Sequence, residues 1–214
     1  MSPAGCVLFS LKSRVINKKM INKNFNLIIT GVGGQGLITL LQITAQAAFA
    51  EGYDIKTSEL HGLSQRGGSV AAYLKFGKRV YSPLISAGQA DVVLGLEILE
   101  GVRALPYADK NTIFVINKFY FPFEGGLPQS ETIRKINTLV KGPKYLIPAS
   151  EICQRELGRE VVSGIYLLGC AVFKKIIPLR PDSVLKAIEQ VMPEKYLELN
   201  RAAFNLAKSY KYGD

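Results

Sequence analysis

Histidine, cysteine and tryptophan are scarce in this sequence. Its 214 residues include one histidine, His61, three cysteines and no tryptophan. The cysteines, Cys6, Cys153 and Cys170, are odd in number and far apart, so they predict neither a disulfide framework nor a ligand set for zinc or an iron–sulfur cluster. We expect free thiols in a reducing cytoplasm and no metal site.

Long apolar runs are also missing. No stretch approaches the ~20 consecutive apolar residues of a membrane-spanning helix, so the sequence predicts no membrane contact. Apolar residues still make up 48 % of the chain, which is enough for one sizeable core. The composition is that of a folded, cytoplasmic domain.

Acidic residues are absent from residues 1–23, which contain five basic ones. This segment supplies half of the formal net charge of +10. The remainder is mildly basic and has no Lys/Arg run with interleaved aromatic residues, so we expect no nucleic-acid partner. We predict that residues 1–23 form a poorly ordered basic extension, with Met20 as an alternative start, and that residues 24–214 form a single domain.

Several catalytic signatures are missing as well. The sequence has no G-x-S-x-G motif and no carboxylate pair of the kind that glycosidases use. Leu37 and Ile38 occupy the places that Lys and Ser/Thr take in a nucleotide-binding P-loop, which argues against an NTPase. We therefore predict no catalytic residue in this chain.

The most informative stretch runs from Phe25 to Ala50. An apolar run predicts a buried strand, and apolar residues recur later at helical spacing. Between them, GVGGQG at 31–36 matches G-x-G-x-x-G, a tight turn whose free amides at a helix N-terminus can hold a phosphate. The alternative is that the glycines only let the helix pack closely on its sheet. The candidate ligand-binding residues here are Gly31, Gly33, Gly34, Gln35 and Gly36.

A second polar, glycine-rich loop follows the next predicted strand. Its Arg66, flanked by glycines, can grip a phosphate or a partner's carboxylate through two parallel hydrogen bonds. The alternative is a solvated connection that leads into a hairpin. The candidate contact residues in this loop are His61, Ser64, Gln65, Arg66, Gly67 and Gly68.

Strand and helix patterns predict an α/β fold, a Rossmann-like, three-layer mixed sheet with C-terminal helices. Residues 69–76 and 79–85, separated by Gly77-Lys78, predict a hairpin, and hence antiparallel strands in the sheet. The other predicted strands are 53–58, 91–96, 112–117 and 144–147. The predicted helices are 97–105, 130–140, 149–157, 163–177, 181–191 and 194–210.

Two acidic residues, Glu97 and Glu100, follow the predicted strand 91–96. Ligands of α/β proteins bind outside the carboxyl ends of the strands, so both residues are placed where a ligand would bind. They are equally typical of acids in the first turn of a helix, where the helix dipole stabilises negative charge. The sequence leaves both interpretations open.

Four ordered motifs resemble the gamma-type subunit of 2-oxoacid:ferredoxin oxidoreductases. They are GVGGQG at 31–36, TSELHGLSQRGGSV at 57–70, VYSPLI at 80–85 and ADVVLGLE at 90–97. The HGLSQRGG form of the loop is most similar to small (beta) subunits of indolepyruvate ferredoxin oxidoreductases. The resemblance runs from about residue 24 to about residue 207, and residues 1–23 have no counterpart in it.

The resemblance implies a role in a larger enzyme. Its reaction is the oxidative decarboxylation of a 2-oxoacid by thiamine diphosphate, with electrons passing through iron–sulfur clusters to ferredoxin and the acyl group to coenzyme A. The sequence has neither a cluster-type cysteine run nor an acidic thiamine diphosphate motif. This implies a chain that binds no cofactor alone and assembles with a large catalytic (alpha) subunit, which holds both centres and reacts with ferredoxin.

The resemblance also implies that the glycine turn and the 61–68 loop contact coenzyme A, another phosphate-bearing ligand, or the partner subunit. Two other hypotheses start from the glycine turn itself. One is a free-standing NAD(P)-dependent dehydrogenase, for which Glu59 lies near the place of a ribose-binding acid. The other is a non-enzymatic module that binds anions or proteins.

Overall fold

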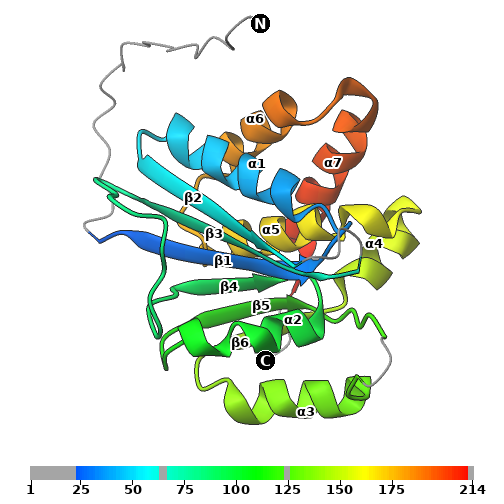
Figure 1. Ribbon diagram of the computed structural model, residues 1–214. Helices are drawn as coiled ribbons and strands as arrows, with labels where there is room; N and C mark the ends of the chain where they lie inside the picture. The colour runs from blue at the N-terminus through cyan, green and yellow to red at the C-terminus, as the bar shows by residue number, and fades with distance from the viewer. Residues whose placement is uncertain (1–22, 63–66, 123–125, 212–214) are drawn as a thin grey trace, which may run out of the picture.

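The structure is a computed structural model that describes residues 23–62, 67–122 and 126–211 (Figure 1). The predicted extension at residues 1–23 therefore lies outside the described residues, except for Lys23. The same is true of Ser64, Gln65 and Arg66 in the predicted contact loop.

Six strands form one mixed sheet, in the order β2-β3-β1-β4-β5-β6. Strands β1, β4, β5 and β6 run parallel to one another, and β3 pairs antiparallel with both β1 and β2. The strands are β1 (Phe25–Val32), β2 (Asp54–His61), β3 (Ser69–Gly77), β4 (Val92–Gly95), β5 (Ile113–Asn117) and β6 (Lys144–Ile147).

Helices cover the sheet on both sides, which gives the predicted three layers (Figure 1). One side carries α1 (Leu37–Ala50), α4 (Ala149–Leu157), α5 (Ser163–Phe173), α6 (Pro181–Val191) and α7 (Glu194–Leu206). The other side carries α2 (Ile98–Arg103) and α3 (Gln129–Leu139). Three 3₁₀ turns complete the described elements: η1 (Leu105–Tyr107), η2 (Glu160–Val162) and η3 (Ala207–Ser209).

The burial of the strands follows from their residue types. Strand β4 is apolar throughout, and all four of its residues are buried because helices lie on both faces. Strand β3 instead alternates between buried and half-buried residues. Its buried residues, such as Leu74 and Phe76, face α1, while Tyr73 and Lys75 point to the opposite side of the sheet.

The predicted strand at 79–85 is wrong. This segment crosses the face of the sheet instead: Val80 N donates to Asp54 Oδ2 at 2.7 Å, and Lys75 Nζ donates to the Leu84 carbonyl at 2.6 Å. Pro83 has no N–H for a strand ladder. The mixed sheet is confirmed, but the hairpin is formed by β2 and β3 around residues 62–68.

Most helix limits agree with the prediction, and α6 begins and ends at the predicted residues. The helix predicted for 163–177 is shorter, because α5 ends at Phe173. Lys175 adopts a left-handed conformation with φ 60°, and the N–H groups of Ile176 and Ile177 turn back to the Ala171 carbonyl at 2.9 and 3.2 Å. Those bonds end the helix.

None of the helices in the described ranges is long and apolar enough to cross a membrane. Cys153 and Cys170 are both buried, and no disulfide joins them. Burial raises the pKa of the Cys153 thiol to about 12. A thiol with such a pKa is protonated at neutral pH and has little nucleophilic character.

Candidate functional site

The glycine turn lies at the switch point of the sheet. Strand β1 has β3 on one side and β4 on the other. After β1 the chain first adds β2 and β3 on one side of β1, and it then adds β4, β5 and β6 on the other side. In open α/β sheets such a point forms a crevice outside the carboxyl ends of the strands, where ligands bind. The fold thus puts GVGGQG at the edge where a ligand site is expected.

The turn is open in front of two of its glycines. Gly34 and Gly36 have φ values of 103° and 77°, in the left-handed region where L side chains are strained. A β-carbon at either position would meet no atom within 4 Å. Helix α1 begins directly after Gly36 and has no acidic residue in its first turn, so its N-terminal N–H groups favour an anion.

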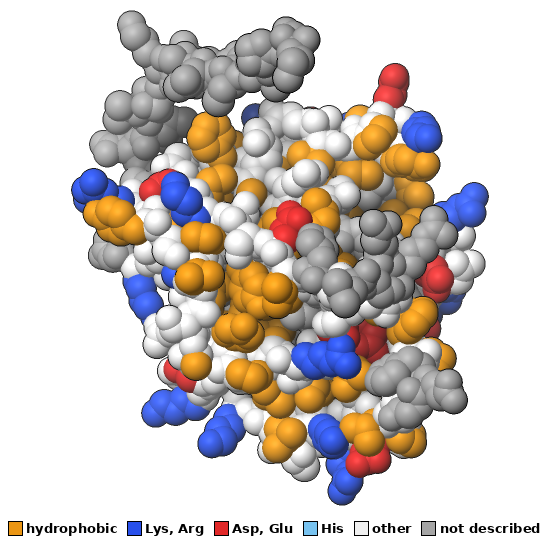
Figure 2. All heavy atoms as spheres, in the orientation of Figure 1, with side chains coloured by type: hydrophobic (Ala, Val, Ile, Leu, Met, Phe, Trp, Pro, Cys, Tyr) orange, Lys and Arg blue, Asp and Glu red, His pale blue; other side chains and the backbone are white. Residues whose placement is uncertain are grey.

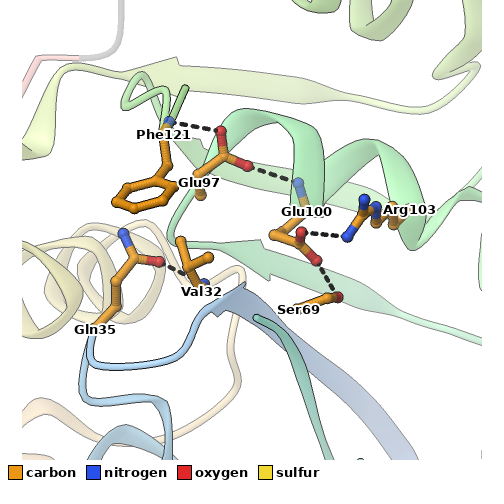
Figure 3. A network of polar contacts seen from close by, with 7 residues as sticks. All are labelled: Val32, Gln35, Ser69, Glu97, Glu100, Arg103 and Phe121. Carbon is orange, nitrogen blue, oxygen red and sulfur yellow. Dashed lines mark hydrogen bonds and ion pairs between the residues drawn. The ribbon is translucent and has the colours of Figure 1, made fainter. Parts of the chain in front are cut away.

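The side chain of Gln35 stabilises the glycine turn through hydrogen bonds to the backbone (Figure 3). Its Oε1 accepts a hydrogen bond from Val32 N at 2.8 Å, and its Nε2 donates to the Leu96 carbonyl at 3.3 Å, at the end of β4. A β-carbon at Gly31 would lie 2.7 Å from Gln35 Oε1, so glycine leaves the space that this side chain occupies. The side chain of Gln35 therefore bonds to the protein itself.

The two predicted loops meet in the structure. Gly33 N donates to the Gly68 carbonyl at 2.8 Å, and Gly67 N donates to the Gly33 carbonyl at 3.3 Å. The register of β1 and β3, which places Val32 opposite Ser69, brings these glycines together. His61 ends β2 at the same edge of the sheet. The structure thus brings the glycine turn together with Gly67 and Gly68, the last residues of the predicted 61–68 loop.

A cleft of about 200 Å³ opens beside the glycine turn. Aromatic side chains form part of its wall, and a β-carbon at Gly67 would lie 3.7 Å from the ring of Phe121. The cleft is lined by Val32, Gly33, Gly34, Gln35, Phe119, Phe121, Ser150, Glu160, Val161 and Ser163.

Glu97 is buried, caps the start of α2 and also binds the segment that contains Phe121 (Figure 3). Its Oε2 accepts from Glu100 N at 2.8 Å at the start of α2, and its Oε1 accepts from Phe121 N at 3.2 Å. Burial raises the pKa of this carboxyl, while these backbone N–H groups act in the opposite direction. Of the two interpretations open from the sequence, the structure supports a helix acid for Glu97.

Glu100 connects α2 to the base of the second loop. Its Oε2 accepts from Ser69 Oγ at 2.5 Å, and its Oε1 pairs with Arg103 Nη1 at 2.7 Å. Only 6 % of the Glu100 side chain is exposed, whereas half of Arg103 is exposed. Ser69 begins β3 directly after the loop, so the hydrogen bond between Ser69 and Glu100 fixes where the loop returns to the sheet.

Glu97→Gln is expected to change how stability depends on pH. A carboxyl with a raised pKa binds its proton more tightly in the folded chain, so the wild-type free energy of unfolding falls as pH rises from 4.5 through the raised pKa. The amide side chain of the variant cannot titrate. The difference between wild type and Glu97→Gln should therefore shift in favour of the variant as pH rises, measured by urea unfolding between pH 4 and 8.

The control for that experiment is Glu198→Gln, because the Glu198 side chain is 86 % exposed. This control is expected to change the free energy of unfolding by no more than about 0.5 kcal/mol. A difference between wild type and Glu97→Gln that stays flat across the pH range would contradict the prediction.

The sequence interpretation missed the far wall of the site. Asn117 Nδ2 donates to the Leu96 carbonyl at 3.3 Å and to Ser150 Oγ at 2.9 Å, which ties together the ends of β4, β5 and the start of α4. Asn117 stands where a buried strand ends, and this is a usable signal for a site residue. Phe119 and Phe121 lie between the predicted strand 112–117 and the predicted helix 130–140, where the sequence predicts no regular element.

The polar side chains that line the cleft are Gln35, the hydroxyls of Ser150 and Ser163, and the carboxylate of Glu160. Helix α1 begins close by, directly after Gly36. Within the described ranges, no three His, Cys, Asp or Glu side chains lie close enough together to hold a metal ion. The start of α1, which has no acidic residue in its first turn, is the part of this arrangement that favours an anionic group.

Comparison with known proteins identifies the family. The model of the pyruvate ferredoxin/flavodoxin oxidoreductase family matches residues 26–210, nearly the whole described chain. The chain belongs to this family. As a pyruvate ferredoxin/flavodoxin oxidoreductase family member, it is a subunit of a ferredoxin oxidoreductase complex.

Relatives of full subunit length support this assignment within the oxidoreductase family. The IorB subunit of the indolepyruvate oxidoreductase of Thermococcus kodakarensis is 33 % identical over 190 residues, which is 86 % of this chain and 94 % of that protein. The IorB subunit from Archaeoglobus fulgidus is 34 % identical over 187 residues, 85 % of this chain and 92 % of that protein.

Solved structures share the fold of this family member. The gamma subunit of the keto/oxoacid ferredoxin oxidoreductase from Geobacter sulfurreducens has a TM-score of 0.67 and 22 % identity, over 86 % of this chain and 96 % of that one. The 2-oxoglutarate:ferredoxin oxidoreductase of Magnetococcus marinus has a TM-score of 0.67 and 18 % identity, over 91 % of this chain and 32 % of that one. The same fold thus occurs as a separate subunit and as part of a longer chain.

Proposed function

We propose that this chain is the small subunit of an indolepyruvate-type ferredoxin oxidoreductase. In this proposal the enzyme decarboxylates arylpyruvates oxidatively, forms aryl-acetyl-coenzyme A and reduces ferredoxin. The large partner subunit holds thiamine diphosphate and the iron–sulfur clusters, in the cytoplasm. This chain supplies shape and hydrogen-bond donors to the site.

The match in length with the IorB subunits is the observation that carries the proposal. This chain covers 94 % of the Thermococcus kodakarensis protein at 33 % identity, so the two correspond as whole subunits. The sequence here contains three dispersed cysteines, too few and too far apart to ligate clusters. A division of labour between two subunits accounts for both facts.

The glycine turn is proposed to contact a phosphate group of coenzyme A. The open space before Gly34 and Gly36, the N–H groups at the start of α1 and the lack of acid in its first turn all favour a phosphate. The 61–68 loop, tied to Gly33 through Gly67 and Gly68, is proposed to contribute to the same binding. Contact with the partner subunit is the alternative for both loops.

Reconstitution tests the proposed function. The chain is co-expressed with the large subunit of the same enzyme, and reduction of a viologen dye is followed with indolepyruvate and coenzyme A. The complex is expected to reduce the dye, whereas either subunit alone should give no more than the rate without enzyme. Pyruvate and 2-oxoglutarate serve as control substrates and should react more slowly.

Three results, one of them from a separate NADH titration, would contradict all or part of the proposal. Full activity of the large subunit without this chain would show that this chain is not a required subunit. Fluorescence enhancement of NADH on titration with this chain, together with turnover of a hydroxy acid, would favour the NAD(P)-dependent dehydrogenase instead. Pyruvate as the preferred substrate would keep the subunit role and change the substrate class.

A further inference from the structure

Within the described residues, no helix packs on the α2 side of β2 and β3, which form one edge of the sheet. Helix α2 packs against β1, β4 and β5, and α3 packs against α2. On β2 and β3 the residues that face this side are Lys56, Ser58 and Leu60 together with their cross-strand partners Lys75, Tyr73 and Ala71. The segment 79–85 crosses this part of the sheet and covers only some of it.

Large apolar side chains are exposed on this half of the sheet. Leu60 is 62 % exposed, Tyr81 78 % and Leu84 72 %. In the view of Figure 2, apolar side chains gather near the middle of the molecule, with Lys and Arg side chains to the left and below. Tyr81 and Leu84 belong to one short segment, and Leu60 lies further along β2. Exposed apolar side chains on one face are typical of an interaction site.

The backbone that presents two of these side chains is held in place. Asp54 Oδ2 accepts from Val80 N at 2.7 Å, the Leu84 carbonyl accepts from Lys75 Nζ at 2.6 Å, and Ser82 Oγ accepts from Leu84 N at 3.2 Å. The guanidinium of Arg79 lies 5.1 Å from the centre of the Tyr81 ring. A segment fixed in this way loses little conformational freedom when a partner binds.

Positive charge borders the exposed apolar residues. Lys56 and Lys75 are opposite each other on β2 and β3, and Arg79 stacks on Tyr81. Asp54 is the acid among them, and it pairs with Lys56 at 3.5 Å. We define the Tyr81 surface as Leu60, Tyr81 and Leu84 with the bordering cations Lys56, Lys75 and Arg79.

We propose that the Tyr81 surface binds an apolar patch with an acidic border on the large partner subunit; this rests on the proposed function. A second copy of this chain would bring the same three cations against themselves. The chain's own residues 1–22 contain four basic residues and no acid, so they have the same sign of charge as the border. A different, acidic polypeptide is the occupant that complements the surface.

One end of the surface, Leu60, lies next to the 61–68 loop. Leu60 directly precedes His61, where β2 ends and the 61–68 loop begins. That loop is tied to the glycine turn by the bonds between Gly33 and the pair Gly67 and Gly68. Tyr81 and Leu84 are held at the other end of the strand pair, by Asp54 where β2 begins and by Lys75 on β3. A partner that covers the whole surface therefore extends along β2 towards the loop.

Single variants of the complex test this inference. Tyr81→Glu and Leu84→Glu, each co-expressed with the tagged large subunit, are expected to raise the dissociation constant of the complex about tenfold or more, measured by mass photometry of a dilution series. Phe49→Glu is the matched control, because Phe49 is 59 % exposed on α1, on the other side of the sheet. It should leave the dissociation constant unchanged.

A charge-reversal variant keeps the test independent of folding. Lys56→Glu/Arg79→Glu changes exposed side chains only and is expected to slow association, with the loss shrinking as salt is added. Wild-type affinity in Tyr81→Glu, Leu84→Glu and this double variant would overturn the inference. So would a wild-type homodimer that Leu84→Glu disrupts while the complex with the large subunit persists.

The chain's own N-terminal segment is tested by thiol labelling of Tyr81→Cys. Protection within the complex, lost when the subunits dissociate, is the expected result. Protection that is lost only on removal of residues 1–22 would overturn the inference. A complex that assembles through this surface but does not reduce the dye would contradict the proposed function alone.

Discussion

Phe204→Ala is expected to lower the free energy of unfolding by about 3–5 kcal/mol. Phe204 is fully buried in α7, and its ring centre lies 5.1 Å from that of Phe173 at the end of α5. Truncation would leave a cavity between these two helices, of which α5 packs against β5 in the sheet and α7 packs on α5. Since small domains are stable by only about 5–15 kcal/mol, this single change removes a large share of the total.

Urea unfolding followed by circular dichroism measures this loss, and Phe49→Ala is its matched control. The same atoms are removed from Phe49, but that side chain is 59 % exposed, so the change is expected to stay within about 0.5 kcal/mol. Equal losses in the two variants would show that the α5–α7 contact is not part of the core.

Much of the fold could be predicted because its signals are local. Continuous apolar runs identify β1 and β4, which are buried on both faces. Pro181 and Pro193 frame α6, and Gly52 and Gly158 follow helices in the left-handed conformation. These residues act on the backbone next to them, so no distant contact is needed to interpret them.

The errors arise where distant contacts decide the structure. The alternation in residues 79–85 is compatible with a strand, but Asp54 and Lys75 hold the segment across the sheet through hydrogen bonds. Nothing in the local pattern indicates these partners. The end of α5 has a different, local cause: it depends on Lys175, a residue type that rarely adopts positive φ.

The internal contacts of the candidate site could be predicted only in part, for the same reason. The glycine turn is a local motif, whereas its bond to Gly67 and Gly68 results from the pairing of β1 with β3. The sequence could not assign Glu97 to a ligand or to a helix, since only its burial and its bonds to two backbone N–H groups decide. Phe119 and Phe121 reach the cleft through a loop that has no regular pattern.

Gly34→Asp is expected to weaken coenzyme A binding by the assembled enzyme, compared with Gly34→Asn. Gly34 has φ 103° and open space before it, so either short side chain would project into free volume, and Asn and Asp tolerate positive φ best. Only Asp adds a negative charge. Two unit charges about 8 Å apart repel by about 2 kcal/mol at an effective dielectric constant of about 20.

That energy corresponds to a roughly 30-fold higher KM for coenzyme A in Gly34→Asp than in Gly34→Asn. The measurement is viologen reduction by each complex as coenzyme A and, separately, the oxoacid are varied. The KM for the oxoacid should be the same in both variants, because the oxoacid is proposed to react on the partner subunit.

If Gly34→Asp instead weakens subunit assembly and leaves the KM for coenzyme A unchanged, the glycine turn contacts an acidic region of the partner. Because the two variants share the same strain at Gly34, any difference between them reports charge alone.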